Sequence, residues 1–201
     1  MRMDNEVIKE EDQLKYLGVK FDTRFNFVKH VAEVKRKTES ALASFRHLAG
    51  KNKLQKKVRQ CMYSVALKTI ITYAFPAWHG ITAVQMEVLR TLERKALRFV
   101  HGDRGRVADS FRFIRNEQLY EETEFKRIDV VCIVRGVEYL RKATEHGNEL
   151  ARRYLGSGVR SGVGGMRYRS PARILEDFSE GVTEGGIVGL YHQRSHAVGT
   201  V

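Results

Sequence analysis

The spacing of apolar residues along this chain is that of α-helices, and this periodicity constrains the fold most. Between residues 26 and 50 one face recurs in alternating steps of three and four, through Val31, Val34, Thr38, Ala41, Phe45 and Leu48. Such a seam is typical of a helix that packs one side against a core. We expect this first helix to end at Gly50, because glycine suits the residue that follows a helix.

Similar patterns predict further helices in the middle of the chain. A second helix should run from about Lys53 to Phe75, with a strongly apolar second half, and Pro76 should end or kink it. Trp78, which follows that apolar half, should be largely buried. A third helix is expected over residues 83–100, a loop over 103–116, and a long helical stretch over 117–155.

The two ends of the chain differ from this helical middle. Residues 14–22 are rich in strand-forming residues, and Gly18 permits a bulge or a close approach of the backbone. Residues 156–201 hold ten of the 17 glycines and have no periodicity, so we expect a disordered tail. The predicted fold is therefore mainly α, with a β element at residues 1–22, a helical domain at 23–155 and a glycine-rich tail at 156–201.

The charge of the chain favours a polyanionic partner. The net charge is +12, and residues 28–68 hold eleven lysines and arginines against only Glu33 and Glu39. Nucleic acid is the leading partner, an anionic membrane surface is the rival, and a merely basic protein is the third possibility. No apolar window is long enough to span a membrane, and the charged N-terminus has no signal-peptide core. We expect an intracellular protein, nuclear or cytoplasmic, that is not secreted.

No arrangement of residues indicates catalysis, a metal site or a small-molecule substrate. Cys61 and Cys132 match no zinc spacing and imply no disulfide framework. The glycines after residue 155 lack the Lys-Ser/Thr of a phosphate-binding loop. The paired acids Glu11–Asp12 and Glu121–Glu122 are better explained as solvated charge, the second pair at a helix start.

Two basic clusters are candidates for contacts with nucleic acid. Lys35, Arg36 and Lys37 follow the β element closely, with only Glu33 and Glu39 as nearby acids. Arg90, Arg94 and Arg98 recur every fourth residue on one face of the third helix. This stripe could track a phosphate backbone, but a solvated face with Glu87 paired to Arg90 or Arg94 fits the sequence slightly better.

Three blocks resemble the region that follows the palm in reverse transcriptases of non-LTR retrotransposons, especially the jockey-like group. The first is "YLGVKFDTRFNFVKHV" at residues 16–31, the second "MYSVALKTIITYAFPAWHG" at 62–80, and the third "LRTLERKALRFVHG" at 89–102. Thr69 and Ala74 stand where this family usually has proline and glycine, and Glu93 stands where glutamine is common. The resemblance covers residues 14–155.

The resemblance implies the end of a polymerase palm followed by helices of the thumb. It assigns Tyr16, Leu17 and Gly18 to a primer-grip-like hairpin that approaches a nucleic-acid strand. The catalytic carboxylates and their Mg²⁺ would belong to a palm upstream of this sequence, so we expect no cofactor and no polymerase activity in this chain alone.

Three hypotheses for function follow. In the first, the chain is a truncated fragment of an RNA-directed DNA polymerase that binds RNA or DNA without sequence preference and has the rest of the enzyme as a further partner. Alternatively, it is an independent basic helical module that binds nucleic acid. The third hypothesis is a remnant of a transposable element with no selected function.

Overall fold

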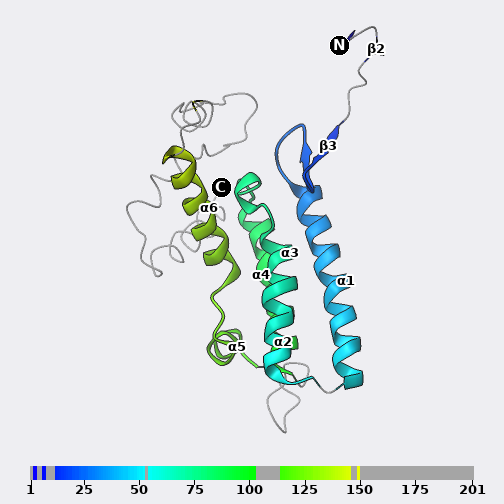
Figure 1. The fold of residues 1–201 in the computed structure, drawn as a ribbon, viewed down its shortest axis with the longest axis vertical. Coiled ribbons are helices and arrows are strands. Elements are labelled where there is room, and N and C mark those ends of the chain that lie inside the picture. Colours follow the sequence, from blue (N-terminus) through cyan, green and yellow to red (C-terminus); the bar gives the residue numbers. More distant parts are fainter. Residues whose placement is uncertain are drawn as a thin grey trace, which may run out of the picture.

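The computed structural model describes residues 2–3, 6–7, 12–52, 54–102, 114–145 and 149. Over these residues the chain is mainly helical with a short antiparallel hairpin near its N-terminus, which confirms the predicted fold class. The long helices lie side by side with similar axes, and the hairpin sits at one end of the first (Figure 1). The predicted disordered tail at 156–201 lies outside the described residues.

The β element is a hairpin of two short strands. Strand β3 (Gln13–Tyr16) pairs antiparallel with β4 (Val19–Asp22), and a two-residue turn, Leu17–Gly18, joins them. Both turn residues have positive φ, 44° and 83°, as the turns favoured by two-residue hairpins require. Strand β4 packs against the first helix and buries Val19, whereas β3 is exposed. A second small pair, β1 (Arg2–Met3) with β2 (Glu6–Val7), precedes the hairpin.

The first helix, α1 (Val28–Asn52), buries the predicted seam at Val31, Val34 and Thr38. Its start is shaped by Asn26, whose side-chain oxygen accepts a hydrogen bond from the backbone N–H of Val28. The prediction that Gly50 ends the helix was wrong. The chain keeps a helical conformation through this glycine, which does not adopt the positive φ of a terminating residue.

The second long helical element consists of three consecutive segments, of which the last two are called the η1–α3 rod. Helix α2 (Lys56–Met62) passes into a π-helical turn, η1 (Tyr63–Leu67), and then into α3 (Lys68–Thr72). The predicted end at Phe75 was three residues too late, because Ala74 takes a left-handed conformation and a 3₁₀ turn, η2 (Phe75–Ala77), holds Pro76. The turn buries Trp78 completely, as predicted, and the indole Nε1 donates to the carbonyl of Tyr73 at 2.8 Å.

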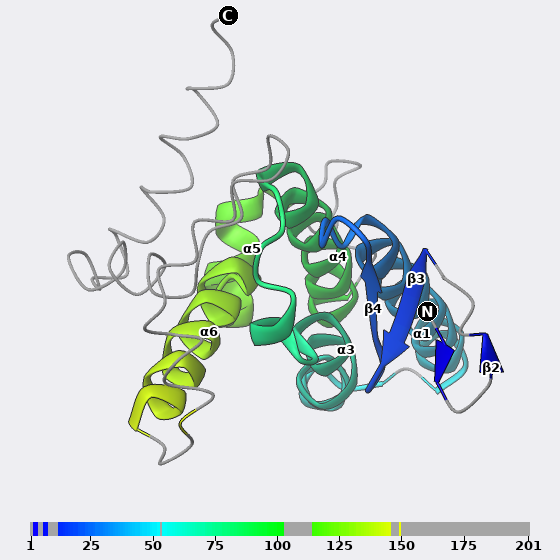
Figure 2. The same ribbon diagram turned by 90° about the horizontal axis from the view of Figure 1, so that it is seen from above.

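Helix α4 (Ala83–His101) matches the predicted third helix and lies between α1 and the last helices (Figure 2). It begins with a capping box, in which Thr82 and Gln85 exchange hydrogen bonds between side chain and backbone. Of the loop expected before the next helix, residues 103–113 are outside the described residues.

The expected continuous helix from 117 onward is wrong, because the chain forms two helices there. Helix α5 (Asn116–Thr123) stops at Glu124, which has a left-handed conformation with φ of 59°. A short link then leads to α6 (Ile128–Glu145). The pair Glu121–Glu122 therefore lies near the end of α5 and not at the start of a long helix.

Two apolar clusters form the core, the first against the earlier half of α4 and the second against its later half. The first joins β4, α1, α3, α4 and α6 around Trp78, and the second joins α1, η1, α4 and α5 around Tyr63. No helix among the described residues is both long and apolar enough to cross a lipid bilayer.

Candidate nucleic-acid interface

The tip of the β3–β4 hairpin is fixed against the end of α3. The hydroxyl of Tyr73 donates to the carbonyl oxygen of Leu17 at 3.1 Å. A Cβ atom added to Gly18 would stand 3.3 Å from Cε1 of the same tyrosine ring. Glycine is therefore needed here both for its backbone conformation and for its lack of a side chain. The hairpin tip at Gly18 thus lies close to a protein side chain, and its expected approach to a nucleic-acid strand stays a prediction.

A groove of about 470 Å³ lies where the hairpin tip, α1 and the η1–α3 rod meet. Its lining is mostly apolar with a few polar groups: Leu17, Gly18, His30, Glu33, Val34, Lys37, Val65, Ala66, Thr69, Ile70 and Tyr73. It thus combines residues from the first and second blocks of the sequence resemblance. Beside it, the side chains of Tyr16 and Leu17 are exposed on the hairpin.

The predicted basic cluster on α1 is divided between two sides of the helix. Lys37 lines the groove at the hairpin, whereas Lys35 lines a second, shallower groove of about 390 Å³ between α1 and α4, together with Lys95. Arg36 makes a two-pronged contact with Glu33, at 2.8 and 3.0 Å. This hydrogen bond from Arg36 lowers the pKa of Glu33 to about 2, so its carboxylate stays charged.

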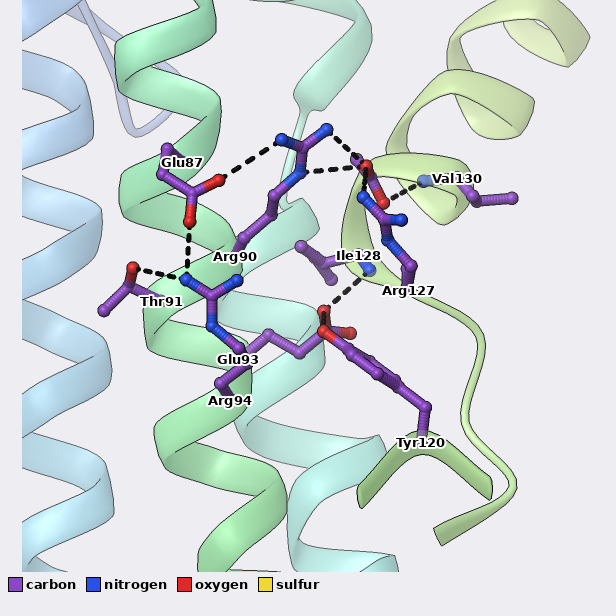
Figure 3. Close-up of polar contacts among 10 residues, drawn as sticks. Glu87, Arg90, Thr91, Glu93, Arg94, Tyr120, Arg127, Ile128 and Val130 are labelled. Atoms are coloured by element: carbon purple, nitrogen blue, oxygen red, sulfur yellow. Dashed lines mark hydrogen bonds and ion pairs between the residues drawn. The ribbon is translucent and has the colours of Figure 1, made fainter. Parts of the chain in front are cut away.

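The arginine stripe on α4 is engaged within the protein. Arg90 binds Asp129 of α6 at 2.6 Å and also Glu87, and its side chain is only 13% exposed. Arg94 binds Glu87 at 2.5 Å, and Arg98 donates to Asn116 of α5 (Figure 3 shows the first two). The pairing with Glu87 was expected, but the stripe is not a solvated face. Arg90 links α4 to α6 and Arg98 links α4 to α5, whereas Arg94 binds residues of α4 itself.

His30 stands at the base of the groove and is 3% exposed. Its Nδ1 accepts a hydrogen bond from the backbone N–H of Lys20 at 3.3 Å, and its ring meets the ring of Trp78 edge to face. Burial, together with the charges of Lys37 and Lys20, lowers the pKa of this histidine. The neutral ring that results carries its proton on Nε2, which has no hydrogen-bond partner among the described residues.

A buried carboxylate at Glu93, which the sequence analysis treated only as a substituted glutamine, ties four segments together. It accepts hydrogen bonds from the hydroxyls of Tyr63 at 3.1 Å and Tyr120 at 2.7 Å, and from the backbone N–H of Ile128 at 2.9 Å. Figure 3 shows the last two. Burial raises the pKa of Glu93 to about 7, against the opposing effect of these hydrogen bonds. The group joins η1 and α5 to the first turn of α6.

A sign of this carboxylate was present in the sequence. Glu93 interrupts a stripe of buried apolar residues on α4 that continues on both sides through Met86, Leu89, Leu97 and Val100. A charged residue on an apolar stripe indicates either a paired buried group or an incorrectly placed helix face.

No group of three or more His, Cys, Asp or Glu residues within the described part of the chain could hold a metal ion. Cys61 is exposed, Cys132 is buried, and both are free thiols. Comparison of the chain with protein-family models, with curated proteins and with solved structures found no match.

Proposed function

We propose that this chain binds RNA or DNA without sequence preference, as a thumb-side fragment of a reverse transcriptase of the non-LTR, jockey-like type. The proposal rests on the sequence resemblance and on the excess of positive charge over residues 28–68. The observation that supports it best is that the hairpin tip, Lys37 and Tyr73 line one groove.

The basic groups available to this surface differ from those suggested by the sequence alone. Lys35 and Lys37 are the strongest candidates for phosphate contacts, because both line grooves on α1. Arg36 is already neutralised by Glu33, and Arg90 and Arg94 are held by Glu87 and Asp129. Phosphate contacts of lysines position a nucleic acid but do not read its sequence.

The test is a salt series of fluorescence-anisotropy titrations with labelled DNA and RNA of two unrelated sequences each. The full chain should bind all four at low salt, with affinities that fall linearly on a log–log plot. Replacing Lys35 and Lys37 by alanine should reduce the steepness of that plot by about 1–2, roughly one counterion for each lysine.

The matched control replaces Arg160 and Arg167, two basic residues of the glycine-rich tail, by alanine. It should change the slope less than the α1 variant does. Equal losses in both variants would mean that bulk charge and not a surface on α1 accounts for binding. No binding at low salt would contradict the proposed function and favour a remnant with inherited charge.

A further inference from the structure

We propose that the groove between the hairpin tip, α1 and the η1–α3 rod receives one unpaired nucleobase of a single-stranded nucleic acid, stacked on Tyr73. This inference rests on the proposed function and deepens it. Phosphate contacts alone would accept single strands and duplexes alike, whereas a groove that takes a base requires a strand whose bases are free.

The groove has the size and lining of a site for a small flat group. Its volume of about 470 Å³ lies within the range usual for ligand pockets, about 300–1,000 Å³. The lining exposes mostly apolar atoms. Its aliphatic residues are Leu17, Val34, Val65, Ala66 and Ile70. An apolar groove with few polar groups can contact the apolar face of a heterocyclic base and hydrogen-bond its edge. It suits a base better than it suits a phosphate.

Tyr73 supplies a stacking surface that is already in position. Its side chain is 52% exposed, yet its hydroxyl is bound to the carbonyl of Leu17 and its ring is in contact with Gly18. A ring held at both its edge and its hydroxyl loses little freedom when a base stacks on it. Stacking of bases on aromatic side chains is a common source of affinity for single strands and tolerates any sequence.

His30 provides an independent polar feature in the same groove. Its Nε2–H is a buried donor with no partner in the part of the chain that the structure describes, and leaving such a donor unsatisfied is costly. The edge of every nucleobase presents carbonyl oxygens or ring nitrogens, which are acceptors of the kind that this donor lacks in the folded chain. The same donor would gain nothing from an aliphatic side chain of a docked peptide.

The charge at the groove suits a strand that continues on either side of the bound base. Lys20, Arg36 and Lys37 all lie within ion-pair distance of Glu33, the one acid in the lining. These three cationic side chains and the single carboxylate of Glu33 leave an excess of positive charge beside the groove. The flanking phosphates of a single strand would meet this excess, which matches the opposite charge of the partner.

The experiment compares two single strands of equal charge. One is an oligothymidylate of about 12 nucleotides, within the site sizes usual for single-strand binding, and the other is an abasic sugar–phosphate strand of the same length. We expect the strand with bases to bind about tenfold more tightly, since one stacked base contributes of order a tenfold change in affinity. A hairpin duplex with the same number of phosphates and no free bases should bind like the abasic strand.

The only tryptophan provides an internal probe of occupancy. Trp78 lies with its ring centroid 4.8 Å from that of His30, so a base seated against His30 should change its fluorescence. The abasic strand should leave the emission unchanged at saturation.

Variants of the lining test the placement. Tyr73→Leu removes the aromatic ring on which the base stacks, and Ala66→Leu narrows the groove. Each variant should abolish the preference for the strand with bases, while binding of the abasic strand persists. Tyr73→Phe should keep the preference, and so should Tyr139→Leu, a matched control at an exposed tyrosine on α6. Circular dichroism verifies that each variant is folded, and Ala66→Leu retains both hairpin contacts of Tyr73.

The outcomes separate this inference from the proposed function. Equal affinity for the strand with bases, the abasic strand and the duplex would overturn the base site and leave sequence-indifferent binding intact. A preference for bases that survives both Tyr73→Leu and Ala66→Leu would also overturn it. Failure to bind any of the three at low salt would overturn the proposed function, and the base site with it.

Discussion

Replacing Glu93 by glutamine should remove a pH dependence of stability that is built into the core. The carboxyl is fully buried, and its pKa is raised from 4.5 to about 7 in the folded chain. The folded state therefore holds this proton more tightly than the unfolded state does. The contribution of Glu93 to stability is complete below pH 4.5 and is lost as the pH rises through 7.

The size of the effect follows from the shift in pKa. A difference of one pKa unit corresponds to about 1.4 kcal/mol, so the shift at Glu93 corresponds to a loss of about 3 kcal/mol across this pH interval. Other groups titrate in the opposite sense. Burial lowers the pKa values of His30 and His79, so their neutral forms favour the folded state above pH 6.5. The difference between the parent chain and Glu93→Gln isolates the carboxylate from these groups.

The assay is urea unfolding followed by the fluorescence of Trp78, repeated at intervals from about pH 4 to pH 8. The free energy of unfolding of Glu93→Gln should increase relative to that of the parent by about 3 kcal/mol as the pH rises, because only the parent loses stability through this group. Glu121→Gln, at an exposed position on α5, is the control and should run parallel to the parent. Parallel curves for the parent and Glu93→Gln would refute the reasoning about this buried group.

Three further variants test separate parts of the fold, each by chemical denaturation at constant pH. Gly18→Ala should destabilise by about 1–2 kcal/mol, because the residue has a φ of 83° and its new Cβ would press on Tyr73; unchanged stability would show that the tip is loose. Trp78→Ala should cost about 3–5 kcal/mol, and a smaller loss would place the indole outside the core. Thr82→Ala should cost about 1 kcal/mol through its bond to Gln85, whereas a neutral result would mean that α4 does not depend on its capping box.

Much of the architecture follows from local patterns in the sequence. Apolar residues spaced alternately three and four positions apart predict α1 and α4, because this spacing places them on one face of a helix, which packs against the core. The run of apolar residues before Pro76 predicts that Trp78 is buried. The strand-forming residues around Gly18 predict a β element, and the resemblance implies that it is a hairpin. The structure has this hairpin and adds that its tip rests on Tyr73.

The remaining features depend on contacts between distant segments, which periodicity does not reveal. The break between α5 and α6 brings the N–H of Ile128 to Glu93, 35 residues earlier in the chain. The arginine spacing on α4 is the same for a solvated face, a phosphate contact or an internal ion pair, and the position of Asp129 decides among them. The groove itself is made by three segments, and of its lining residues the sequence indicated only Leu17, Gly18 and Lys37 as candidates for contact with nucleic acid.

The most direct test of the central claim is to map where a nucleic acid touches the full chain. Photo-crosslinking of a single strand that carries photoreactive bases, followed by mass spectrometry, identifies the peptides in contact. We predict crosslinks in residues 14–37 and 63–73, the segments that form the groove, with Tyr73 among the modified residues. Crosslinks confined to α6 or to the tail beyond residue 155 would contradict the assignment of nucleic-acid binding to the hairpin face.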